Sequence, residues 1–209
     1  MTVLVAGQPA AFAALSINDS AWWYLSRASA IVAWLLLTAA VVWGVLIYTR
    51  VLRPLDRPAW MVDLHRTLGT LALLAIVAHV GALLADRAFP LSLADVLVPG
   101  HSPWKPFGVA LGILALYLVL AIQASSRLRR RLPLQAWRAV HVSSYLVWLL
   151  VALHAGLVGT DVLNRAYQVT ALLVTGAVMI SASVRLLVGR RHAVAARAVR
   201  ASVGSDARN

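Results

Sequence analysis

Five long runs of apolar residues alternate with short polar segments along this chain of 209 residues. A membrane-spanning helix needs about 20 mostly apolar residues, each adding a rise of 1.5 Å, and five stretches meet that length. The pattern therefore predicts an all-α fold, an integral membrane bundle of about five transmembrane helices. The predicted spans are Ala28–Tyr48, Met61–Leu84, Phe107–Ala124, Val140–Val158 and Tyr167–Leu187.

The composition agrees with a membrane protein. Hydrophobic residues make up 61% of the chain and charged residues 12%, whereas soluble domains average about 45–50% and about 25%. We therefore expect a multi-pass protein of the cell (plasma) membrane, with the lipid bilayer as its surroundings. The net charge of +12 could suit nucleic acid, but the basic residues cluster between spans as a topology signal does, so no nucleic-acid partner is expected.

The basic residues also predict an orientation. With five spans, fifteen of the nineteen basic residues lie on one side of the membrane and four on the other. The positive-inside rule assigns the side with more basic residues to the cytoplasm. Residues 1–21 are then a short extracytoplasmic tail, not a signal peptide or a sixth span. Residues 22–188 form the transmembrane domain, and residues 189–209 a basic, disordered cytoplasmic tail. His101, in an outer loop, and His192, in that tail, are expected to be surface residues.

Four histidines lie inside the predicted spans, in two pairs. His65 and His79 are fourteen residues apart in the second span, and His141 and His154 are thirteen apart in the fourth. An ionisable residue at membrane depth costs several kcal/mol unless it has a partner, so it marks function. The two spans run in the same direction, and the spacings rise about 21 Å and about 19.5 Å. The histidines should therefore form an inner and an outer layer.

The residues near each layer restrict what it could bind. A zinc or copper ion takes about three or four protein ligands, but the chain has no cysteine or glutamate, and Asp63 is the only acid near either layer. Haem iron needs only axial ligands from the protein, and two imidazoles complete its coordination. Without cysteine, attachment would be non-covalent. We therefore predict two haem b groups, the inner iron on His65 and His141 and the outer iron on His79 and His154.

Helix geometry suits one pair better than the other. At 100° per residue, fourteen residues return to within about 40° of the starting face, whereas thirteen miss it by about 140°. A π-type bulge or another irregularity is therefore predicted in the fourth span. Small residues near the histidines either make room for a cofactor or are ordinary contacts between membrane helices. They are Gly69, Gly81, Ser143, Ser144 and Gly156.

Three arginines are candidates to bind the carboxylates of a haem, which need cationic or hydrogen-bonding partners. Arg66 adjoins His65, and Arg138 lies one turn before His141. Both suit the inner haem, although either could instead extend its guanidinium to the membrane interface. Arg27, at the outer end of the first span, suits the outer haem, because arginines are scarce on that face.

The two histidine stretches resemble a known family. LHRTLGTLALLAIVAHVGA and QAWRAVHVSSYLVWLLVALHAG, with the basic turn RLRRRLPLQAWRAVH, are similar to the ferric reductase-like transmembrane domain family. That family includes ferric reductases, NADPH oxidases and the haem subunit of the periplasmic methionine sulfoxide reductase system. The resemblance covers about residues 22–188. It implies two b haems that pass electrons across the membrane, held by histidines fourteen and thirteen apart.

The predicted function is transmembrane electron transfer, as one component of an oxidoreductase and with no catalytic residue of its own. The tail after the fifth span has no G-x-G-x-x-G motif for a nucleotide. The expected donor is therefore a cytoplasmic flavoprotein reductase that carries FMN or FAD, or a membrane quinol. The expected acceptor is an extracytoplasmic protein, a flavin or a ferric chelate.

Two alternatives remain at this point. The chain could be a quinol-linked haem anchor for a partner reductase, which the sequence does not separate from ferric reduction. It could also be a haem-free transporter subunit or structural anchor, although its spans show no broken helices in inverted repeats.

Overall fold

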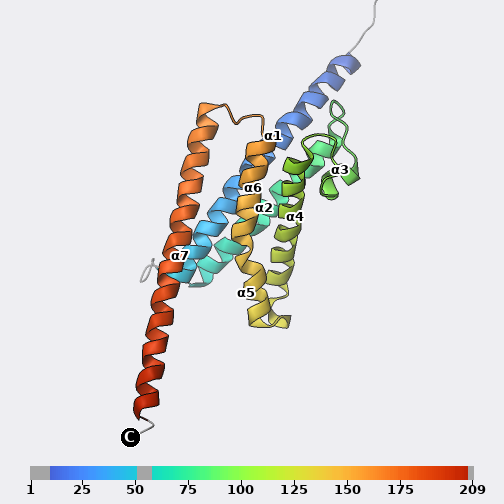
Figure 1. Cartoon of the computed structure of the whole chain (residues 1–209). Coiled ribbons are helices and arrows are strands. Elements are labelled where there is room, and N and C mark those ends of the chain that lie inside the picture. The colour runs from blue at the N-terminus through green and yellow to red at the C-terminus, as the bar shows by residue number, and fades with distance from the viewer. Residues whose placement is uncertain (1–9, 51–57, 207–209) are drawn as a thin grey trace, which may run out of the picture. The chain divides into compact units, whose positions relative to one another are not determined.

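The computed structural model describes residues 10–50 and 58–206, and every regular element in these ranges is helical (Figure 1). Five helical stretches are long and apolar enough to cross a membrane, which confirms the predicted all-α membrane bundle. The candidate spans are Ala21–Thr49, Ala59–Ala85, Pro106–Arg127, Leu134–Val158 and Arg165–Arg191. The elements in chain order are α1 (Ala10–Thr49), α2 (Pro58–Ala85), α3 (Leu93–Leu97), α4 (Pro106–Arg127), the 3₁₀ turn η1 (Arg129–Arg131), α5 (Leu134–Val142), α6 (Ser144–Val158) and α7 (Arg165–Asp206).

The chain forms two compact units. The first unit contains the described residues up to Leu37 together with Gly69–Thr160, and the second contains Thr38–Leu68 and the described residues from Asp161 onward. The helices α1 and α2 each contribute one part to either unit. The predicted site residues are therefore described below within the unit to which each belongs.

The core of the first unit lies where α4 packs against α6. Ala115 and Val119 of α4 and Val147 of α6 are buried together. The small side chain of Ala115 lets the two helix backbones approach closely, which is how membrane helices gain packing energy without a hydrophobic driving force. The partly buried side chains around this cluster come from α1, α2, α4 and α6, and they are Leu37, Leu73, Ile76, Leu118, Ile122, Leu150 and Val151.

Aromatic contacts connect the helices of the second unit. The indole Nε1 of Trp43 on α1 donates a hydrogen bond to the carbonyl of Met61 on α2, at 2.9 Å. The Trp43 ring also meets Trp60 edge-on, with 5.6 Å between ring centroids. On α7, the guanidinium of Arg185 lies 5.0 Å from the ring centroid of Tyr48. These contacts hold the end of α1, the start of α2 and α7 together.

Two helices extend further than the apolar pattern of the sequence predicts. The helix α1 begins at Ala10, inside the predicted N-terminal tail, and α7 continues to Asp206 through the tail that was expected to be disordered. Both extensions are rich in alanine, and the second also in arginine, which are strong helix formers. Residues 1–9 and 207–209 of these tails lie outside the described residues.

Candidate cofactor site

His79 lies on α2 and is held by the backbone of α1. Its Nδ1 is 2.8 Å from the carbonyl oxygen of Ser26. Because a carbonyl can only accept, Nδ1 carries the hydrogen, and the lone pair of the neutral ring is on Nε2. The acceptor is itself well fixed, since Ser26 is buried and its hydroxyl donates to the carbonyl of Trp23 at 2.9 Å. The second ring nitrogen of His79 is thus prepared to act as a ligand.

His154 on α6 has the same arrangement with α4. Its Nδ1 donates to the carbonyl oxygen of Gly108 at 2.8 Å, which again leaves the lone pair on Nε2. The imidazole passes so close to α4 that a Cβ at Gly112 would be 2.7 Å from Nδ1 and 2.8 Å from Cε1. Only glycine fits at this position without moving the ring.

The start of α4 is fastened to the end of α6, beside this contact. Lys105 precedes α4 and donates from Nζ to the carbonyl of Leu157 at 2.8 Å. That carbonyl is one of the last four of α6, which have no partner within their own helix. A Cβ at Gly108 would be only 2.6 Å from Cγ2 of Val158. This close approach brings the carbonyl of Gly108 within reach of His154.

The structure brings the two predicted outer histidines close to one another within the first unit. The imidazoles of His79 and His154 are near enough to interact electrostatically. In the part of the chain that the structure describes, no three His, Cys, Asp or Glu side chains gather as metal ligands. Among the described residues, side chains of these four types could therefore supply at most two ligands to a metal at this position.

His65 belongs to the second unit and lies against α1. The backbone of Ala40 is within hydrogen-bonding reach of its ring, and a Cβ at Gly44 would be 3.2 Å from its Cε1. Ser26 and Ala40 are fourteen residues apart on α1, the same spacing as the two histidines on α2. Both histidines of α2 are therefore supported by α1 backbone at matching positions.

His141 belongs to the first unit and stacks on Trp137. The two rings lie one turn apart on α5, with 5.0 Å between centroids and an interplanar angle of 23°. The guanidinium of Arg129 lies 4.6 Å from the centroid of the Trp137 ring. The indole Nε1 is buried and has no hydrogen-bond partner among the described residues. Leaving such a donor unpaired costs about 1–3 kcal/mol, so this orphan N–H needs an explanation.

The fourth span is irregular between its two histidines, as the thirteen-residue spacing predicted. The span breaks at Ser143 into α5 and α6. The N–H of Ser143 reaches the carbonyl of Val140 at 3.2 Å, and its hydroxyl donates to the same carbonyl at 2.6 Å. This is a tightened 3₁₀-type turn, so the predicted irregularity is confirmed, and of the two forms allowed it is not the π-type bulge. A 3₁₀ turn rotates about 120° per residue, whereas an α-helix rotates about 100°. The extra rotation reduces the angle of about 140° by which His154 would miss the face of His141. A π bulge, which rotates less per residue, would increase that angle.

The three predicted arginines have different surroundings. Arg27 is partly buried, and its guanidinium lies 4.1 Å from the ring centroid of Trp23. It follows directly in sequence on Ser26, whose carbonyl holds the His79 imidazole. Arg66 forms an ion pair with Asp63 at 3.3 Å, and both side chains are about 70% exposed, so the pair contributes little to stability. Arg138 is exposed on α5. Of the three, Arg27 is the one directly beside a residue that supports a histidine.

Trp137 is not among the site residues predicted from the sequence, because an indole just before a predicted span is typical of the aromatic belt at the membrane surface. Its position four residues before His141 was the available signal, since residues i and i+4 of a helix are neighbours. The orphan Nε1 could not be found from sequence, because burial depends on the surrounding helices.

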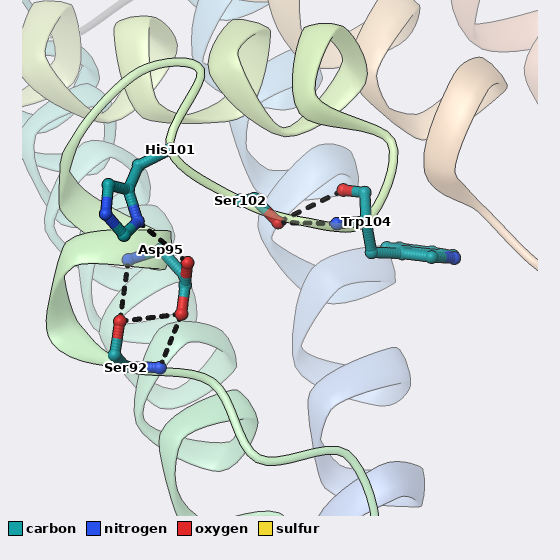
Figure 2. Close-up of polar contacts among 5 residues, drawn as sticks. All are labelled: Ser92, Asp95, His101, Ser102 and Trp104. Atoms are coloured by element: carbon teal, nitrogen blue, oxygen red, sulfur yellow. Dashed lines mark hydrogen bonds and ion pairs between the residues drawn. The ribbon is translucent and has the colours of Figure 1, made fainter.

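The loop between α2 and α4 contains a separate polar cluster (Figure 2). Asp95 accepts hydrogen bonds from the hydroxyl and backbone N–H of Ser92, at 2.6 and 2.8 Å, and from Nδ1 of His101, at 2.9 Å. These bonds, chiefly those from Ser92, lower the pKa of Asp95 to about 2. His101 is 55% exposed, as expected for a surface residue. The cluster fastens the loop, because it joins the start of α3 to the segment that follows it.

Comparison with known proteins gives one family. The family model described as ferric reductase like transmembrane component matches residues 29–152. This match covers more than half of the chain and includes His65, His79 and His141, and it ends two residues before His154. No curated protein and no solved structure matches the chain.

Replacing Gly112 by alanine should displace the His154 ring, because the new Cβ would lie 2.7 Å from Nδ1. We expect the free energy of unfolding in mild detergent to fall by about 1–3 kcal/mol, as for other overpacked sites. Gly176→Ala is the matched control, since a Cβ there meets nothing within 4 Å. Equal thermal midpoints for the two variants would contradict the close contact.

The Asp95 carboxylate should stay ionised to about pH 2, below its ordinary pKa of 3.8. Because the folded pKa is lowered, the cluster stabilises the loop fully above about pH 4, and this contribution is lost as the pH falls through about 2. The carboxyl ¹³C shift of Asp95 would report the midpoint, and Ser92→Ala should raise it towards 3.8. A wild-type midpoint already near 3.8 would disprove the hydrogen-bonded arrangement.

Proposed function

Because the chain belongs to the ferric reductase like transmembrane component family, we propose that it carries single electrons across the membrane through two b-type haems. His79 and His154 would hold one haem. His65 and His141 would hold the other, an assignment that rests on the sequence spacing. Bound haem supplies a one-electron couple at its iron.

The observation that best supports the proposal is that His79 and His154 make the same kind of hydrogen bond. Each donates Nδ1–H to a backbone carbonyl on a neighbouring helix. In metal sites, such a bond fixes the tautomer, orients the ring and raises the basicity of the ligating nitrogen. Two neutral imidazoles with Nε2 available in one layer are the donor set that a six-coordinate haem iron requires.

The residues around these imidazoles act by restricting their movement. Gly112 allows the His154 ring to lie against the α4 backbone, and Lys105 ties α4 to the end of α6. A ligand held by packing and hydrogen bonds loses little further freedom when it binds iron. Arg27 follows directly in sequence on Ser26, whose carbonyl holds His79, and it would neutralise a haem carboxylate.

The direction of transfer follows from the basic residues between the spans. They favour a cytoplasmic C-terminus, so the layer of His65 and His141 would face the cytoplasm. The donor would be a cytoplasmic flavoprotein carrying FMN or FAD, or a membrane quinol. The acceptor would be an extracytoplasmic protein, a flavin or a ferric chelate.

Replacing His79 by alanine should remove one haem and leave part of the other, because only one layer loses a ligand. Dithionite-reduced minus oxidised spectra and haem per chain measure this directly. Proteoliposomes loaded with a reductant should also stop reducing an impermeant ferric chelate outside, since the electron path is cut.

His101→Ala is the matched control, because this histidine lies in a loop outside the spans and is bound to Asp95. It should keep both haems and full transmembrane transfer. Equal loss of both haems in the His79→Ala protein would count against the assignment of ligands to layers. Haem loss in the control would show that histidine replacement acts through general damage.

A further inference from the structure

Trp137 has a buried polar atom that nothing in the described chain satisfies. Its Nε1 is covered by protein atoms and has no hydrogen-bond partner among the residues that the structure describes. Buried donors in native proteins are nearly always paired with protein, water or a bound group. An indole of the membrane-surface belt would instead direct its N–H to water or lipid headgroups. The covered N–H therefore indicates an acceptor that belongs to a bound molecule.

The surroundings of Trp137 identify the chemistry of that acceptor. The ring stacks on His141, at 5.0 Å between centroids, and the guanidinium of Arg129 lies 4.6 Å from the ring centroid. An N–H donor and a permanent cation close together favour an anionic acceptor, and a hydrogen bond to a carboxylate is roughly twice as strong as a neutral one. The acceptor is thus expected to be a carboxylate next to His141.

We propose that Trp137 is a haem-binding residue of the His141 layer. Its Nε1–H donates to a propionate carboxylate, while its ring packs against the imidazole and keeps it oriented. Arg129 balances the charge of the same carboxylate. This assignment rests on the proposed function, since it needs a haem ligated by His141, and it adds Trp137 and Arg129 to the arginines predicted for this role.

The test compares two replacements that distinguish the contribution of the N–H from the contribution of the aromatic ring. Trp137→Phe keeps an aromatic ring for stacking but removes the donor, and Trp137→Ala removes both. Purified full-length protein is mixed with excess apomyoglobin, and haem transfer is followed optically as two phases. The kinetic phase that is altered in a His141→Ala protein is assigned to the haem of the His141 layer.

In the Trp137→Phe protein, haem of the His141 layer should leave about tenfold faster, the loss expected for one hydrogen bond to a charged group. The midpoint potential of this haem should become more negative, because its carboxylate charge is less well neutralised. Trp137→Ala should show a larger effect. Trp104→Phe, in the loop before α4, is the matched control and should change neither phase.

The outcomes separate this inference from the proposed function. If the wild-type protein binds two haems, and the Trp137→Phe protein shows unchanged haem transfer and an unchanged midpoint potential, the proposed role of the N–H is overturned. Equal acceleration of both phases would show a general structural effect and would also overturn it. A wild-type protein that binds no haem would instead refute the proposed function itself, and this inference with it.

Discussion

An imidazole inside a membrane-spanning helix must have both ring nitrogens satisfied, and the candidate site depends on this constraint. Lipid offers no hydrogen-bond partner, so the first nitrogen has to find one within the protein. The structure provides it from backbone carbonyls of neighbouring helices, Ser26 of α1 for His79 and Gly108 of α4 for His154. The second nitrogen of each ring is then the one that remains for a ligand.

This constraint determines how closely the helices pack. A side chain reaches a carbonyl of another helix only where that helix offers little bulk of its own. The glycines that make room are therefore on the helices facing the histidines, at Gly44 on α1 and Gly112 on α4. Because residues four apart share one face of a helix, Gly108 and Gly112 together leave one face of α4 without side-chain atoms.

Much of the fold could be predicted from the sequence, because long apolar runs and loop charges have a direct physical cause in the bilayer. The histidine pairs were also visible, since ionisable residues stand out in such runs. The glycines that contact the imidazoles, Gly44 and Gly112, were not among the small residues predicted near the histidines, whereas a Cβ at Gly81 or Gly156 would meet nothing within 4 Å. The carbonyl partners lie 53 and 46 residues from their histidines, and sequence alone does not give the register between helices.

The break in the fourth span shows what spacing can and cannot predict. The thirteen-residue spacing of His141 and His154 required an irregularity, because a regular helix would direct the two side chains apart. The form of that irregularity depended on Ser143, whose hydroxyl bonds to the carbonyl of Val140 and tightens the turn. Serine competes with backbone hydrogen bonds in this way, but the outcome is set by the local geometry.

We propose that two layers of paired imidazoles each ligate one haem. The most direct measurement is the amount of haem per chain in the purified protein, together with its electron paramagnetic resonance spectrum. We expect two non-covalent b haems per chain, both low-spin with two imidazole ligands. A protein with no dithionite-reducible haem, or with a single haem per chain, would contradict it.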